Sequence, residues 1–321
     1  MGYTHTLLSG ARCVEMDCWN NEKDPAEPKV THGMTLTTHI PFRAVVKVVR
    51  EAIDKEVADA EKHGDAPPPP VMISLENHCT PDVQKRLVEI MREEWGDRLV
   101  SNLVEDAEDI KLSQLSGKIV CMIEYYGGQS EEEVKAETAE ALEVNDSDDE
   151  DTRKMKEKKS KAKGKIIPEL TALGIYAASV KPTSNNWLEG TMTEPKNHLI
   201  NVGEGACEKY LEKNRDALVK HNAQHLMRVY PAGMRVTSKN LYPVNFWDGG
   251  AQVCALNWQT VSHVIASGSV RYMLLTGCFC SLTRVCSSTT PCLQVSDRLI
   301  EVVRLIWKSL TKSCVHSAPL Q

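Results

Sequence analysis

The sequence has 321 residues, of which 41% are hydrophobic and 26% are charged, with a formal net charge of −6 at pH 7. A chain of this length can bury a sizeable core as one large or two ordinary domains. It holds no apolar run of about eighteen residues and no secretory signal at its start, so we expect no transmembrane segment and an intracellular protein. Its eleven cysteines are an odd number, which favours reduced thiols over a disulfide framework.

The first extended segment, residues 12–19, reads RCVEMDCW, and its apolar residues alternate with Glu15 and Asp17. This period of two predicts a strand on which both carboxylates point to the same side. Adjacent carboxylates repel each other unless something positive lies between them. Such a pair is more often a solvated face or half of an ion pair than a metal site, but its apolar neighbours favour a functional role.

Six further β-rich segments follow in chain order, and amphipathic helical patterns separate several of them. These segments are residues 70–77, 118–126, 173–181, 198–204, 225–231 and 251–260. Residues 80–96 predict a helix that Thr80 caps and Pro81 begins, and residues 206–226 predict another. Such an alternation predicts a parallel sheet, open or closed, and seven strands come close to the eight of a (βα)₈ barrel. One strand is missing from that count.

Glu76 lies near the end of its predicted strand, as Glu15 and Asp17 do in theirs. Because a barrel gathers its functional groups at the carboxyl ends of its strands, we expect these three carboxylates to converge. They would make a hard oxygen site suited to Ca²⁺, and the absence of nearby His–Cys pairs argues against zinc. His32 follows the acidic pair in a short extended run. A lone histidine is usually structural, but this one could act as an acid or base.

Residues 129–165 are acidic at first and then basic, with almost nothing apolar to bury. This composition predicts a disordered linker. Its lysines have no interleaved aromatic residues and adjoin the acidic run, so we expect no nucleic-acid partner. The linker separates one half of the chain, residues 1–128, from a second half, residues 166–261.

The tail, residues 262–321, differs in character from the rest of the chain. Four of its cysteines, Cys278, Cys280, Cys286 and Cys292, match no zinc pattern well. Residues 296–313 predict an amphipathic helix that packs on the domain or lies on a membrane surface.

Four stretches carry a resemblance to a known family: GARCVEMDCWN at 10–20, HGMTLTT at 32–38, VMISLENHCTPDVQ at 71–84, and residues 221–260. They closely resemble the X and Y boxes of the eukaryotic phosphoinositide-specific phospholipases C, in the family's order. The resemblance implies a TIM-like (βα)₈ barrel split into X and Y halves by the linker. It also implies calcium-dependent hydrolysis of phosphatidylinositol 4,5-bisphosphate to diacylglycerol and inositol trisphosphate in signalling, by a cytoplasmic protein that binds peripherally to the inner face of membranes.

The same resemblance implies roles for residues of the X half. Glu15, Asp17 and Glu76 match the residues that bind the calcium ion, and Glu15 is then placed to take the proton of the inositol 2-hydroxyl. His32 matches a catalytic histidine that protonates the departing diacylglycerol oxygen.

In the Y half, Arg228 and Tyr230 match the arginine and tyrosine that hold the headgroup, and Asn201 aligns with a headgroup serine. Two departures accompany these matches. Met122 and Glu124 stand where the family usually carries two lysines for the ring phosphates.

The second departure is the family's Ser-x-His-Asn-Thr-Tyr motif of the first barrel strand, which carries a catalytic histidine and a calcium ligand. It is not found in this sequence. We therefore expect an enzyme seen as an incomplete chain, truncated at both ends, with weak calcium binding and impaired activity. The alternative is a non-catalytic relative that keeps the barrel core as a binding or regulatory module.

Overall fold

The computed structural model describes residues 2–32, 38–103, 110–125, 166–180, 187–188, 197–232 and 239–258. The predicted linker and the predicted tail lie outside these residues, so the expectations for both stay predictions. No helix in the described part of the chain is long and apolar enough to cross a membrane.

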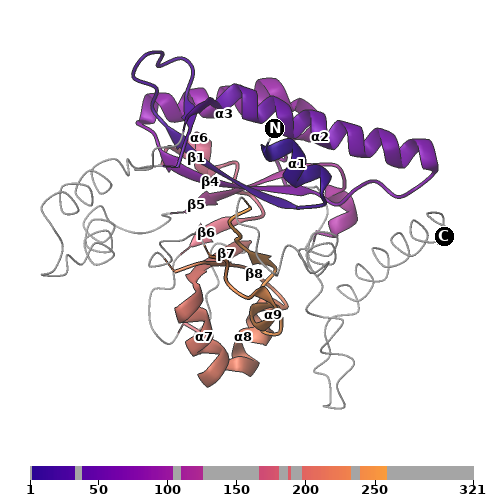
Figure 1. The fold of residues 1–321 in the computed structure, drawn as a ribbon, viewed down its shortest axis with the longest axis vertical. Helices are drawn as coiled ribbons and strands as arrows, with labels where there is room; N and C mark the ends of the chain where they lie inside the picture. Colours follow the sequence, from indigo (N-terminus) through magenta and orange to yellow (C-terminus); the bar gives the residue numbers. More distant parts are fainter. Residues whose placement is uncertain are drawn as a thin grey trace, which may run out of the picture.

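The centre of the described fold is a nine-stranded sheet in the order β3-β2-β1-β4-β5-β6-β7-β8-β9 (Figure 1). Seven strands form its parallel part: β1 (Cys13–Trp19), β4 (Val71–His78), β5 (Ile119–Glu124), β6 (Ala178–Val180), β7 (His198–Gly203), β8 (Leu226–Tyr230) and β9 (Val253–Cys254). The predicted parallel sheet is therefore confirmed strand by strand. The short strands β2 (Lys29–Val30) and β3 (Ile40–Pro41) pair antiparallel beside β1 and were not predicted.

Helices cover the outer face of this sheet. The X half carries α1 (Gly2–Leu8), α2 (Phe42–His63) and α3 (Pro81–Trp95), and α2 and α3 lie together over β1, β4 and β5 (Figure 1). The Y half carries α6 (Pro168–Thr171), α7 (Glu204–Lys213), α8 (Arg215–Asn222) and α9 (Pro243–Trp247). Two 3₁₀ helices, Gly96–Arg98 and Leu112–Leu115, complete the described helices. The curled sheet and its outer helices confirm a TIM-like half-barrel.

Three helical details differ from the sequence predictions. The long helix α2 was not predicted. The single helix predicted over residues 206–226 is in fact two, because the backbone at Asn214 (φ −134°, ψ 34°) leaves the helical region. The predicted side-chain cap at Thr80 is wrong: its backbone N–H donates to Asn20 Oδ1 at 3.1 Å, while Pro81 begins α3 as expected.

Apolar side chains fill three clusters. The largest lies between the X-half strands and helices α2 and α3, and it includes Phe42 and Trp95, both fully buried. A second lies between β7, β8 and the Y-half helices. A third, smaller cluster lines the inner face of the sheet and includes Met122 and Leu199.

The first described residues after the linker pack with the X half. Ile166, Ile167, Leu170 and Leu173 belong to the large cluster beneath α2 and α3. The Ile167 N–H also donates to Gln84 Oε1 of α3 at 2.9 Å. Residues on both sides of the linker therefore share one core.

We expect Leu87→Ala in α3 to lower the free energy of unfolding by about 2–5 kcal/mol, because Leu87 is fully buried and its removal leaves a cavity. Leu103→Ala makes the same change at a side chain that is 65% exposed and should cost less than about 0.5 kcal/mol. Chemical denaturation of both variants measures the difference. Equal losses would contradict this packing.

Candidate active site

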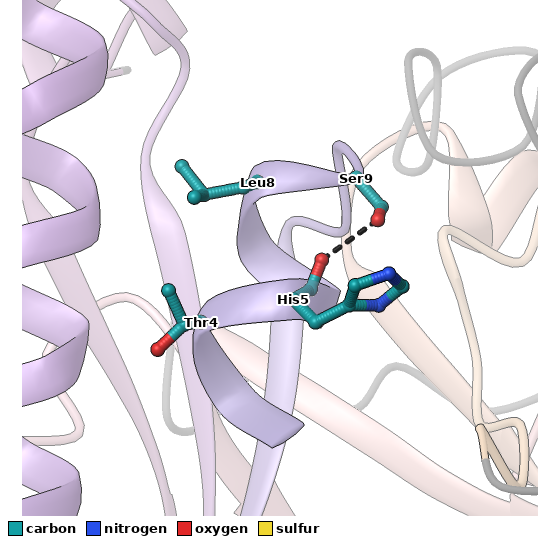
Figure 2. A pocket seen from close by; sticks show the side chains of 4 residues that line it. All are labelled: Thr4, His5, Leu8 and Ser9. Atoms are coloured by element: carbon teal, nitrogen blue, oxygen red, sulfur yellow. Dashed lines mark hydrogen bonds between the residues drawn. The ribbon is translucent and has the colours of Figure 1, made fainter. Parts of the chain in front are cut away.

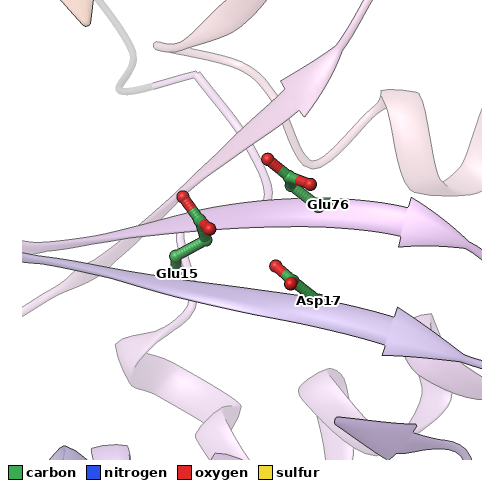
Figure 3. A group of neighbouring side chains, drawn as sticks. All are labelled: Glu15, Asp17 and Glu76. Carbon is green, nitrogen blue, oxygen red and sulfur yellow. The ribbon is translucent and has the colours of Figure 1, made fainter. Parts of the chain in front are cut away.

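Three carboxylates meet on the inner face of β1 and β4. Asp17 lies opposite Glu76 in the parallel register, and Glu15 lies two residues before Asp17 on the same face. One oxygen from each of Glu15, Asp17 and Glu76 lies within 4.8 Å of the other two, and Figure 3 shows the three side chains turned toward one another. We call this group the acidic cluster. The structure thus brings together the predicted ligands, while their role in binding a metal stays a prediction.

The cluster is electrostatically costly when no cation is bound. Burial, followed by the charges of Glu76 and Glu15, raises the pKa of Asp17 to about 7. Burial also raises the pKa of Glu15, although the charge of Arg228 opposes this shift. Three hard oxygen donors gathered this closely fit a divalent cation such as Ca²⁺, whose charge would offset the repulsion that raises the pKa of Asp17. Side-chain exposures of 39% for Glu15 and 48% for Glu76 leave the cluster open to solvent.

Arg228 faces the acidic cluster from the opposite wall. Its side chain is 6% exposed, and Nη2 forms an ion pair with Glu15 Oε2. Nη1 donates to Asn201 Oδ1 at 3.2 Å, and Asn201 Nδ2 donates to Ser179 Oγ at 3.3 Å. Polar side chains of β1, β8, β7 and β6 are therefore linked in one chain across the interior.

Tyr230 stands one layer closer to the carboxyl ends of the strands than Arg228. Its ring centroid lies 5.9 Å from the Arg228 guanidinium carbon, and the side chain is exposed. The neighbouring position in register is Gly203, where an added Cβ would lie 3.5 Å from the Tyr230 ring. An exposed ring beside a guanidinium forms a surface that can accept a polar ring and its phosphate.

His32 lies just after β2 and is exposed. Its positive charge lowers the pKa of Glu15, which places it within electrostatic range of the acidic cluster. Residues 33–37, which follow it, are outside the described part of the chain. The catalytic role of His32 stays a prediction.

Met122 and Glu124 lie on the β5 wall of the same interior. Met122 pairs in register with Ser74 and is 3% exposed within the inner apolar cluster. Glu124 pairs with Ser179 and is half-buried. On this wall beside the acidic cluster, the side chain of Met122 within β5 is apolar, and the side chain of Glu124 at the carboxyl end of β5 is acidic.

A stacked aromatic pair above the acidic cluster was missed by the sequence reasoning. The rings of Trp19 and His78 lie 4.1 Å apart at an interplanar angle of 16°. His78 Nε2 lies 3.7 Å from Glu76 Oε2, while Trp19 Nε1 and His78 Nδ1 are buried without a hydrogen-bond partner in the described structure. The sequence does carry a signal for Trp19, because the period of two that places Glu15 and Asp17 on the inner face of β1 also places Trp19 on that face.

An open hollow of about 500 Å³ lies elsewhere, on α1 and the residue after it (Figure 2). Thr4, His5, Leu8 and Ser9 line it, and the Ser9 hydroxyl donates to the His5 carbonyl at 2.7 Å. None of the acidic-cluster residues contributes to its lining, so we do not associate it with the candidate active site.

Comparison with known proteins agrees with this geometry. Residues 1–124 match the model of the phosphatidylinositol-specific phospholipase C X domain, and residues 170–273 match that of the Y domain. Together these two matches cover more than half of the chain. The chain therefore belongs to the phosphatidylinositol-specific phospholipase C family.

Curated relatives of known name include the 1-phosphatidylinositol 4,5-bisphosphate phosphodiesterases delta-1 of Rattus norvegicus (32% identical over 268 residues) and delta-3 of Mus musculus (32% over 277). The matches cover 80% and 85% of this chain but 34% and 33% of those relatives. The crystal structure of L. pealei PLC21 has a TM-score of 0.65 at 27% identity, covering 86% of this chain and 33% of that one. The chain thus spans about a third of the length of these relatives.

The raised pKa of Asp17 makes the effect of Ca²⁺ depend on pH. Without a cation, folding holds a proton on Asp17 up to about pH 7, whereas the ordinary pKa is 3.8. Stability is therefore lost as the pH rises through about 7. A bound cation offsets this loss, so we expect Ca²⁺ to raise the melting temperature more at pH 8 than at pH 6. Thermal unfolding in chelator and in Ca²⁺ measures both shifts.

Asp17→Asn is the matched variant for this experiment. It removes the titrating group and should reduce the difference between the two pH values. A Ca²⁺ shift that is the same at pH 6 and pH 8 in the unaltered chain would contradict the prediction.

Arg228 already forms an ion pair with Glu15, so it would compete with a cation for the same carboxylate. We expect Arg228→Gln to tighten Ca²⁺ binding by roughly tenfold, or about 1.4 kcal/mol. Arg86→Gln removes the same charge from the surface of α3, where Arg86 pairs with Glu89, and should leave the affinity unchanged. Calorimetry measures both variants, and weaker binding in Arg228→Gln would show that the arginine does not compete.

Proposed function

We propose that this chain forms the catalytic core of a calcium-dependent phosphoinositide phospholipase C, which hydrolyses phosphatidylinositol 4,5-bisphosphate to diacylglycerol and inositol trisphosphate. The observation that supports it most is the acidic cluster facing Arg228 across one interior. A phosphodiester needs both a site for a cation and a donor for the phosphate oxygens, and this interior offers the residue types for each. The names of the relatives agree with this substrate class.

In the proposed reaction, Glu15 removes the proton of the inositol 2-hydroxyl. The raised pKa of Glu15 makes it a stronger base than an exposed carboxylate. Glu15, Asp17 and Glu76 would hold Ca²⁺, which when bound lowers the pKa of that hydroxyl and offsets charge on the phosphate. The resulting alkoxide attacks the phosphorus to give a cyclic phosphate, which water then opens.

His32 is proposed to donate the proton to the departing diacylglycerol oxygen. Its exposed position near Glu15 suits a substrate that enters from the membrane side. Arg228, Asn201 and Tyr230 would hold the headgroup. A guanidinium binds phosphate oxygens through its forked donors, and the tyrosine ring can lie against the inositol face.

A lipid substrate requires the site to meet a membrane surface. We therefore propose peripheral association with the inner face of membranes, where the substrate headgroup is presented to the cytoplasm. The proposal of membrane association rests on the chemistry of the lipid substrate.

A second candidate function is a non-catalytic module that binds or regulates without turnover. Met122 and Glu124 favour it, because an apolar and an acidic side chain on the β5 wall weaken a site for ring phosphates. Product release and vesicle binding can be measured separately, and comparing them distinguishes the enzyme from the non-catalytic module.

The test is Ca²⁺-dependent release of inositol trisphosphate from vesicles that contain phosphatidylinositol 4,5-bisphosphate. Because this sequence holds no Ser-x-His-Asn-Thr-Tyr motif, the assay uses both the chain as given and a form extended before Met1 with a family segment that carries the motif. We expect slow turnover in the first and faster turnover in the second. His32→Ala in the extended form should reduce the rate by roughly 10²–10⁴-fold.

His63→Ala provides the matched control, since His63 is an exposed histidine at the end of α2. It should leave the rate unchanged. A folded, extended chain that binds vesicles but releases no product would favour the non-catalytic function. Equal rates for His32→Ala and His63→Ala would remove His32 from the mechanism.

A further inference from the structure

Three histidines gather on the outer face of the Y half, away from the acidic cluster. His198 begins β7, His221 lies near the end of α8, and His225 lies just before β8. Because Asn201 faces the interior, the alternation of β7 turns His198 outward, toward the helices. His198 is 1% exposed, and its Nε2 lies 3.1 Å from Nε2 of His221.

The hydrogen bonds around His221 fix which of its nitrogens carries the proton. Asn222 Nδ2 donates to the carbonyl of Gly249 at 2.8 Å, so the amide oxygen must face the other way. That oxygen lies 2.9 Å from His221 Nδ1, which therefore carries a hydrogen and donates it. In the neutral ring Nε2 is then unprotonated, and its lone pair points at His198 Nε2.

This arrangement is that of a metal-binding histidine. Ligating histidines usually donate their other ring N–H to an oxygen, which fixes the tautomer and the ring orientation. The Asn222 amide does this for His221. In a tetrahedral site with metal–nitrogen bonds of about 2.0–2.1 Å, two ligating nitrogens lie about 3.3–3.4 Å apart. The observed 3.1 Å between the two Nε2 atoms is close to that separation.

We propose that His198 and His221 form a site for a divalent transition metal such as Zn²⁺. The ion lies beside the line between the two Nε2 atoms and takes a lone pair from each, and the ring hydrogen that His198 Nε2 shares with His221 moves to His198 Nδ1, so that both rings stay neutral. Imidazole nitrogens suit Zn²⁺, Ni²⁺ or Cu²⁺, whereas Ca²⁺ requires oxygen ligands. The site is therefore chemically distinct from the acidic cluster. Water completes the coordination, since His221 is only half-buried.

The neighbouring rings hold the two ligands in place. His225 stacks on His198 with centroids 3.9 Å apart and an interplanar angle of 16°. Trp187 contacts His221 edge-on, at 4.8 Å and 89°. A ring stacked parallel to a ligand cannot direct its own nitrogen at the same ion, so we assign His225 a packing role. An ion bound between β7 and α8 would tie the helix to the sheet.

The test is Zn²⁺ binding to the whole chain by calorimetry, with thiols kept reduced. We expect His221→Gln and His198→Gln each to weaken one binding event by at least about tenfold. His63→Gln, an exposed histidine on α2, and Glu15→Gln, in the acidic cluster, should both leave that event unchanged. If Zn²⁺ binds equally well to His198→Gln and His221→Gln, the ion lies elsewhere and the proposal is overturned.

A second measurement uses the unaltered chain, so it does not depend on whether a variant folds. Nitrogen NMR of the histidine rings should show Zn²⁺ shifting the Nε2 resonances of His198 and His221, while that of His63 stays in place. Ca²⁺ should leave all three unchanged. Unshifted resonances of His198 and His221 at saturating Zn²⁺ would overturn the proposal.

Discussion

The ion pair between Glu15 and Arg228 is the interaction on which the site depends. The two residues belong to β1 and β8, which are separated by five inter-strand steps in the sheet. At about 4.8 Å for each step, a flat sheet would hold these strands about 24 Å apart, beyond the reach of two side chains. The contact therefore requires the sheet to curl until its X and Y parts face each other. The same curl creates the interior that contains the acidic cluster.

The Glu15–Arg228 ion pair matters both for the stability of the fold and for the proposed reaction. Arg228 is almost fully buried, and a buried charge that loses its partner costs about 3–5 kcal/mol. Glu15 provides that partner and is also the proposed base, so the residue that would act on the substrate also neutralises the residue that would hold it. If the proposed site binds both a cation and a phosphate, the two binding events would be coupled, because each ligand releases a charge that the other can use.

Much of this architecture could be predicted from sequence, and the reasons for the rest are physical. The seven parallel strands are short apolar segments between helices and turns, a pattern that indicates burial, and the period of two in β1 correctly put Glu15 and Asp17 on one face. The break at Asn214 depends on a single backbone conformation, which the amphipathic pattern on either side does not reveal. The Glu15–Arg228 pair joins residues 213 positions apart, and periodicity carries no information about such a contact. The stacking of His198 on His225 depends in the same way on tertiary packing.

The shared core beneath α2 and α3 has a consequence for how the molecule could be divided. Ile166, Ile167, Leu170 and Leu173 pack there, and β6 pairs with β5. A cut in the backbone between residues 125 and 166 would break none of the described contacts. Two polypeptides divided in this segment could thus reassemble through these surfaces. The second would supply the four apolar side chains of residues 166–173 that complete the core of the first. The molecule would then behave as a pair of complementing fragments, each of which exposes apolar surface until it meets the other.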